Sequence, residues 1–126
     1  MNTRISGWRL LVVEDEHLIA MLLEDMLVEL GCEVSGVAAS PAQALELLET
    51  CEIDAAVLDV NLDGTDSFGI AAALRERKKP FLFTTGYGEA RLAPEFKGTP
   101  VVQKPYRIEE LARALDRLRA SAGDPQ

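Results

Sequence analysis

Three carboxylates stand directly after two short apolar runs of the sequence. Asp59 follows A-A-V-L (55–58), and Glu14 and Asp15 follow L-L-V-V (10–13). A lone acid at the end of a buried strand is unfavourable unless a cation or a donor compensates for its charge. Because three carboxylates at one place repel one another, they favour a hard cation, and Mg²⁺ suits a site with few carboxylates and several waters.

Two further side chains could handle an anionic group beside Asp59. Thr85 ends the run P-F-L-F-T-T and offers a hydroxyl donor, whereas Lys104 follows P-V-V-Q and offers a fixed positive charge. Together with a cation, they could share the anionic oxygens of a phosphoryl group. The set therefore favours phosphoryl transfer to a carboxylate, with Asp59 as the nucleophile.

Alternating strands and helices must bring these side chains together. Apolar runs predict five strands, and a 3.6-residue period predicts helices between them. Gly31 is placed to end the first helix, and Ser40-Pro41 with Gln43 predicts a capping box at the second. The predicted strands lie at 8–13, 32–37, 55–58, 80–85 and 100–103. The predicted helices cover 19–30, 41–48, 68–74 and 108–118, the third capped by Asp66 or Ser67.

Two segments have weak patterns. Residues 89–97 contain Pro94 and predict only a short or irregular helix, and residues 121–126 predict a frayed, flexible tail. The whole alternation predicts an α/β fold, a doubly wound parallel sheet with helices on both faces. Ligands of such sheets bind outside the carboxyl ends of the strands, which is where the polar residues named above stand.

Composition narrows the class of protein. The chain has 126 residues, a net charge of −8, one histidine and no apolar run long enough to span a membrane. We therefore expect one domain, no direct nucleic-acid binding, no membrane segment and no multi-histidine metal site. Without a signal-peptide pattern, we expect a cytoplasmic protein in which Cys32 and Cys51 are reduced.

The chain resembles the CheY-like response-regulator receiver domains of two-component signalling. The matching motifs, in family order, are L-V-V-E-D-E (11–16), A-V-L-D-V-N-L (56–62), F-T-T-G (83–86) and K-P-Y (104–106). The resemblance implies a flavodoxin-like (βα)5 sheet in the order 2-1-3-4-5. It covers essentially residues 1–126 as a single receiver domain, with a core at about 8–120.

The resemblance also implies the roles of the site residues. Asp59 matches the phospho-acceptor, Thr85 the switch hydroxyl and Lys104 the lysine that contacts the phosphoryl group. Glu14 and Asp15 match the acidic pair of the family.

The family further implies that Mg²⁺ binds to Asp15 and Asp59 with the backbone carbonyl of Asn61, and that the Lys104–Pro105 peptide bond is cis. Such a protein accepts phosphate from a sensor histidine kinase and is not a turnover enzyme. Its only reactions are its own phosphorylation and dephosphorylation.

Two departures point to a subgroup. Val101 stands where the family usually has an aromatic switch residue, so we expect residues 86–99 to carry much of the switch. The stretch P-F-L-F-T-T-G-Y-G (80–88) is similar to that of a subgroup with an F-A-T-G-type motif, whose receivers often stand alone and pair with HWE-type kinases. Output then passes to a downstream protein, to a phosphorelay protein or through a homodimer.

Three alternatives compete with this interpretation. Residues 59–64 match the start of an EF-hand calcium loop, but its twelfth position is Ile70 where a glutamate is required. The D-x-D-G-T motif of haloacid-dehalogenase-type phosphatases would need its nucleophilic aspartate at Asn61. A degenerate receiver that binds partners without phosphorylation is the third alternative, and the complete set of site residues disfavours it.

Overall fold

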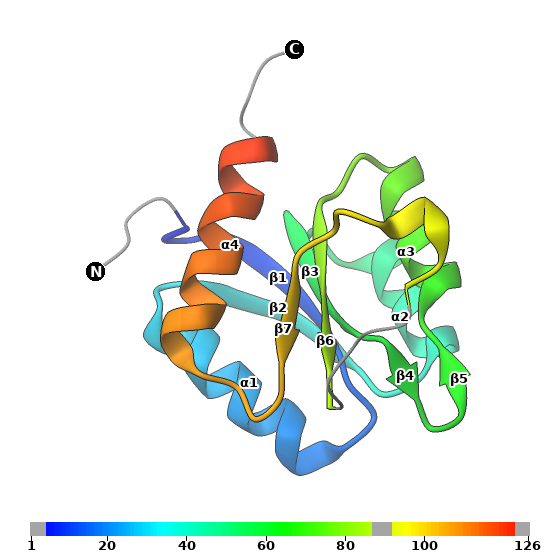
Figure 1. The fold of residues 1–126 in the computed structure, drawn as a ribbon, viewed down its shortest axis with the longest axis horizontal. Coiled ribbons are helices and arrows are strands. Elements are labelled where there is room, and N and C mark those ends of the chain that lie inside the picture. Colours follow the sequence, from blue (N-terminus) through cyan, green and yellow to red (C-terminus); the bar gives the residue numbers. More distant parts are fainter. Residues whose placement is uncertain (1–4, 87–91, 123–126) are drawn as a thin grey trace.

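The sheet has five parallel strands in the order β2-β1-β3-β6-β7, as predicted. The computed structural model describes residues 5–86 and 92–122. The five strands of this sheet are β1 (Arg9–Val13), β2 (Glu33–Ala38), β3 (Ala55–Asp59), β6 (Phe81–Thr85) and β7 (Val101–Gln103). The helices are α1 (His17–Glu29), α2 (Pro41–Thr50), α3 (Phe68–Glu76) and α4 (Ile108–Ala122). This is the predicted doubly wound, flavodoxin-like arrangement (Figure 1).

Helices cover both faces of the sheet and create two cores (Figure 1). Successive residues of a strand point to opposite faces, so Leu10 and Val12 join one core while Leu11 and Val13 join the other. The first core includes Leu23 of α1 and Leu111 of α4. The second core contains side chains of α2 and α3, among them Ala44, Leu48, Ile70 and Leu74. Strands buried on both faces explain the continuous apolar runs of the sequence.

The helix ends follow their local sequence signals with one difference. Gly31, at a φ of 94°, ends α1 because this left-handed conformation suits a residue without a Cβ. At the start of α2, Ser40 Oγ accepts a hydrogen bond from the Gln43 N–H. The Gln43 side chain, however, accepts from the Ala39 N–H and not from the Ser40 N–H, so the predicted capping box is only half formed.

The segment after β3 forms a small hairpin where we predicted a loop. Strands β4 (Asn61–Leu62) and β5 (Thr65–Asp66) pair in antiparallel fashion. Asp63 and Gly64 connect them with φ values of 50° and 88°, and positive φ at both positions is what a type I′ turn requires. A strand and a hairpin replace the helix-flanked loop of an EF-hand, and Ile70 is buried in α3, so the calcium-loop alternative is wrong.

Between β6 and β7 the described residues contain a single 3₁₀ turn, η1 (Pro94–Phe96). This agrees with a short, irregular fourth helix, although residues 87–91 lie outside the described ranges. Phe96 anchors the turn because its ring packs against Phe68, Phe81 and Phe83, with centroids 5.5–5.9 Å apart. At the other end of the chain, α4 continues to Ala122, two residues into the predicted tail, and residues 123–126 are not described.

No helix in the described part of the chain has the length and apolar character needed to cross a membrane.

Candidate functional site

Strand register brings the predicted site residues to one edge of the sheet. Val13 pairs with Leu58, so the residues that follow them, Glu14 and Asp59, leave the sheet side by side. Thr85 pairs with Gln103, which places Lys104 next to the carboxyl end of β6. All four strand ends therefore meet at the lower edge of the view in Figure 1.

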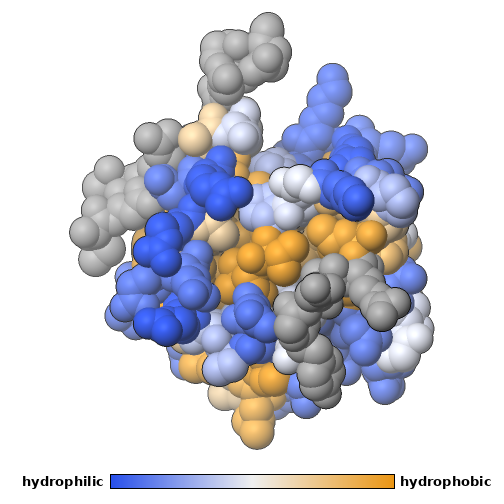
Figure 2. All heavy atoms as spheres, viewed as in Figure 1, coloured by the Kyte–Doolittle hydropathy of each residue, from blue (hydrophilic) through white to orange (hydrophobic). Residues whose placement is uncertain are grey.

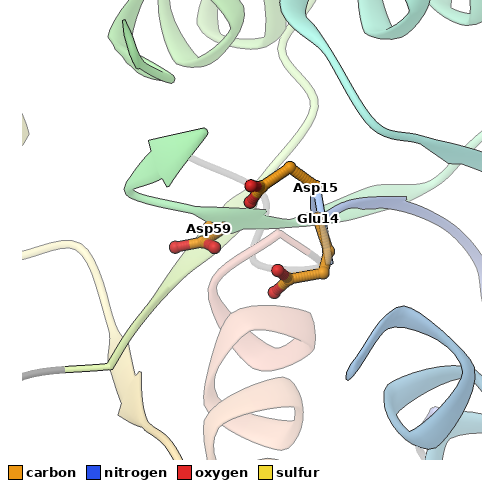
Figure 3. Close-up of side chains that lie close together, drawn as sticks. All are labelled: Glu14, Asp15 and Asp59. Atoms are coloured by element: carbon orange, nitrogen blue, oxygen red, sulfur yellow. The ribbon is translucent and has the colours of Figure 1, made fainter. Parts of the chain in front are cut away.

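The three carboxylates form a compact cluster (Figure 3). One oxygen each of Glu14, Asp15 and Asp59 lies within 4.8 Å of the others. Glu14 and Asp59 are 2% and 5% exposed, whereas Asp15 is half-buried at the surface of the cluster. Three hard oxygen donors at this spacing fit a small divalent cation, which would offset their mutual repulsion.

Lys104 connects the two most buried carboxylates. Its Nζ lies 2.9 Å from Glu14 Oε1 and 2.9 Å from Asp59 Oδ2. Burial acts to lower the pKa of Lys104, but the hydrogen bonds to Glu14 and Asp59 outweigh it and raise the pKa above its usual value. The lysine therefore stays charged. The Lys104–Pro105 peptide bond is cis, as predicted.

The backbone after each acid holds its carboxylate in place. Glu14 Oε2 accepts a hydrogen bond from the Glu16 N–H, and Asp59 Oδ1 accepts one from the Asn61 N–H at 3.2 Å. Burial nevertheless raises the pKa of Glu14, although Lys104 opposes the shift. The Asn61 N–H thus contacts Asp59, whereas the predicted ligand for Mg²⁺ is the carbonyl oxygen of Asn61.

A cleft of about 470 Å³ opens over this cluster. Its lining includes Asp15, Asp59, Asn61, Thr85 and Lys104, which are five of the six predicted site residues. The sixth, Glu14, is buried beneath them. The cleft can therefore accept an anionic group between a carboxylate cluster, a lysine and a hydroxyl.

Tyr106 is the residue that sequence reasoning missed. Its hydroxyl lies 3.4 Å from both Glu14 Oε1 and Thr84 Oγ1, a polar role that the K-P-Y motif alone does not predict. Burial raises the pKa of Tyr106 to about 12, so the hydroxyl stays protonated and can donate. Its only signal in the sequence was its place two residues after Lys104.

Replacing Tyr106 with phenylalanine is expected to lower the free energy of unfolding by about 0.5–1 kcal/mol. The ring is retained, so the loss reports the hydroxyl alone, and it is small because contacts of 3.4 Å are long for O–H···O bonds. Urea unfolding at neutral pH measures the difference. An ultraviolet titration should also lose a tyrosine transition near pH 12 in the variant. An unchanged titration curve would contradict the assignment.

Val101 begins the edge strand β7, and its side chain is 39% exposed. The segment 86–99, which we predicted to carry the switch, is described only at Gly86 and from Leu92 onward, so its role stays a prediction.

Comparisons with known proteins show what the chain as a whole is similar to. The family model for the response regulator receiver domain matches residues 10–116. The transcriptional regulatory protein TcrA of Mycobacterium tuberculosis is 38% identical over 122 residues, which cover 93% of this chain and 47% of TcrA. The chain spans about half the length of the curated relatives that it matches first.

Solved structures show the same similarity. SdrG from Sphingomonas melonis Fr1 is 42% identical with a TM-score of 0.80, covering 93% of this chain and 98% of SdrG. A second SdrG structure, of its BeF3-activated conformation, matches with a TM-score of 0.77 at 42% identity, over 90% of this chain and 98% of that one. The receiver domain of PhyR from Erythrobacter litoralis is 27% identical with a TM-score of 0.83, over 96% of both chains.

Proposed function

Because this chain belongs to the response regulator receiver family, we propose that it accepts a phosphoryl group on Asp59 from a sensor histidine kinase. The observation that carries the proposal is the position of Asp59. Its carboxylate lines the cleft, 2.9 Å from Lys104 Nζ and beside two further acids. The SdrG structure in a BeF3-activated conformation supports the same chemistry in a relative.

In the proposed step, a carboxylate oxygen of Asp59 attacks the phosphorus of a phosphohistidine. A P–O bond forms and the P–N bond breaks, so the electron pair stays on the imidazole nitrogen, which takes up a proton. Lys104 exchanges its contact with Asp59 for one with the phosphoryl oxygens, and the Thr85 hydroxyl donates to another of them. Fixed donors of this kind stabilise charge that develops during transfer.

The metal in this proposal is Mg²⁺, held by Glu14, Asp15 and Asp59 with the Asn61 carbonyl. Bound there, it would neutralise negative charge on the transferred phosphoryl group. Lys104 and the Glu16 N–H both orient the Glu14 carboxylate and so hold it beside the other two proposed carboxylate ligands.

The proposed output is a phosphorylation-dependent protein contact in the cytoplasm, without direct nucleic-acid binding. The partner is a downstream protein, a phosphorelay protein or a second copy of the chain. The P-F-L-F-T-T-G-Y-G stretch (80–88) supports membership of the F-A-T-G-type subgroup and an HWE-type kinase.

Intact-mass spectrometry after incubation with acetyl phosphate tests the proposal. We expect the mass of one phosphoryl group to be added when Mg²⁺ is present and none to be added when a chelator removes it. No added mass with Mg²⁺ would favour the degenerate-receiver alternative. Sustained hydrolysis of p-nitrophenyl phosphate would instead favour a phosphatase.

A further inference from the structure

A second cleft lies at the end of the sheet opposite Asp59. It is a groove of about 540 Å³ between the end of α3, the start of β6, the segment before β7 and the end of α4. We name it the basic groove, since four basic side chains line it: Arg75, Lys78, Lys79 and Lys97. Figure 1 shows these segments at the upper edge, away from β4 and β5, and hydrophilic residues occupy that edge in Figure 2.

The charge of the basic groove opposes that of the whole chain. The net charge is −8 and only 13 residues are lysine or arginine, yet four of these line one groove. None of the four forms an ion pair with a carboxylate of residues 5–86 or 92–122. Like charges gathered in one groove repel one another, and an anionic ligand would relieve this repulsion.

Arg75 is held in place before any ligand arrives. Its guanidinium lies 4.7 Å from the centre of the Phe96 ring, and its Nη1 donates to the Glu95 carbonyl oxygen at 2.8 Å. A guanidinium has five N–H donors in a rigid plane, so others stay available for a phosphate or carboxylate. An arginine whose orientation is already fixed loses less entropy on binding.

Lys78 occupies a backbone position that favours glycine. Helix α3 ends with hydrogen bonds from the Lys78 N–H to the Arg75 carbonyl and from the Lys79 N–H to the Leu74 carbonyl. Helix α1 ends in the same motif, but there the left-handed residue is Gly31. Lys78 adopts a φ of 59°, which is unfavourable for a residue with a Cβ, and such strain concentrates at functional sites. The strained residue lines the groove.

Apolar side chains also line the basic groove, beside Gly98, Thr99 and Ser121. Phe81 and Leu118 are each 6% exposed, and Pro80 and Pro100 are half-buried beside them. The volume falls in the range of small-molecule sites, about 300–1,000 Å³. Several cations beside an apolar surface suit a ligand that combines two or more negative charges with a flat ring.

We propose that the basic groove binds a small organic diphosphate of the nucleotide type. The phosphates lie against Arg75, Lys78 and Lys97, and the ring lies on Phe81 and Leu118. This site is separate from the phosphoryl-accepting cleft and does not depend on it.

Nuclear magnetic resonance titration of the full chain with ADP, in the presence of a chelator of divalent cations, tests the proposal. We expect saturable shifts at the amides of Lys78, Phe81, Thr99 and Leu118. Pyrophosphate should bind about tenfold more weakly because it lacks the ring, and adenosine should not saturate the site. Shifts confined to Gly86 and Lys104, or no saturation, would overturn the proposal, as would tighter binding of polyglutamate than of ADP.

Two variants separate binding from folding. Lys78→Gly relieves the backbone strain, so its thermal midpoint should equal or exceed that of the wild type, while ADP affinity falls about tenfold. Arg77→Gln is the matched control: it removes a neighbouring charge that pairs with Glu49 outside the groove. Its ADP affinity should change less than about twofold. Equal loss in both variants would indicate nonspecific charge attraction and contradict the proposed site.

Discussion

Replacing Lys104 with methionine is expected to lower the free energy of unfolding by about 2–4 kcal/mol at pH 7 without magnesium. Methionine keeps much of the apolar length of the side chain but removes the charge that compensates Glu14 and Asp59. The side chains of these two acids are only 1% and 7% exposed, so water cannot replace the lysine. Urea unfolding of both proteins in a chelator measures the loss.

The loss should depend on pH because Glu14 becomes easier to protonate. Burial already raises the pKa of Glu14, the charge of Asp59 adds to this, and Lys104 acts to lower it. Without Lys104, the pKa in the folded protein rises further above its unfolded value. When a carboxyl group has a higher pKa in the folded than in the unfolded protein, the free energy of unfolding falls as the pH rises from the unfolded pKa through the folded one. The deficit should therefore be larger at pH 7 than at pH 5.

Lys97→Met is the control for this experiment. Lys97 is exposed and makes no ion pair with a carboxylate in the described ranges, so its replacement should change stability by less than about 0.5 kcal/mol. Equal losses for Lys104→Met at both pH values would contradict the coupling to Glu14.

Magnesium should stabilise the folded protein, and Asp15→Asn should remove most of that effect. At a magnesium concentration of about 100 times the dissociation constant, the wild type should gain about 2.7 kcal/mol. Removing one of three carboxylate ligands should weaken binding by about 10–100-fold, which leaves a gain of about 0.4–1.4 kcal/mol. Asp15 is half-buried, so asparagine there leaves no buried charge unpaired.

Thermal unfolding over a magnesium series measures both gains. Asp63→Asn is a matched control because Asp63 lines the same cleft but does not belong to the carboxylate cluster. Asparagine also tolerates the positive φ of 50° at this turn position. Equal magnesium responses of Asp15→Asn and the wild type would contradict the proposed ligand set.

The sheet and the site edge could be predicted because they depend on strong local signals. Each buried strand is a continuous apolar run, and each run ends at a polar residue such as Glu14 or Asp59. Because parallel strands end at the same edge of a sheet, these residues can be placed together before any side-chain contact is known. This is why five of the six predicted residues line one cleft and the sixth lies beneath it.

The remaining details depend on contacts that no local pattern contains. Tyr106 reaches Glu14 across 92 positions of the chain, so its polar role follows only from the packing of α4 on the sheet. The hairpin β4-β5 contains only two residues in each strand, too few to show an alternating pattern, and only Asp63-Gly64 signalled its turn. Gln43 accepts a hydrogen bond from the Ala39 N–H, a choice of partner that the capping-box pattern does not specify.

Mapping the site of phosphoryl attachment tests the central claim most directly. Treatment of acetyl phosphate-labelled protein with borohydride reduces an acyl phosphate to an alcohol, and peptide mass spectrometry then locates it. We predict conversion at Asp59 alone, with no labelling of Asp59→Asn under the same conditions. Conversion at Asp15 or Asp63, or equal labelling of Asp59→Asn, would contradict the assignment of Asp59 as the phospho-acceptor.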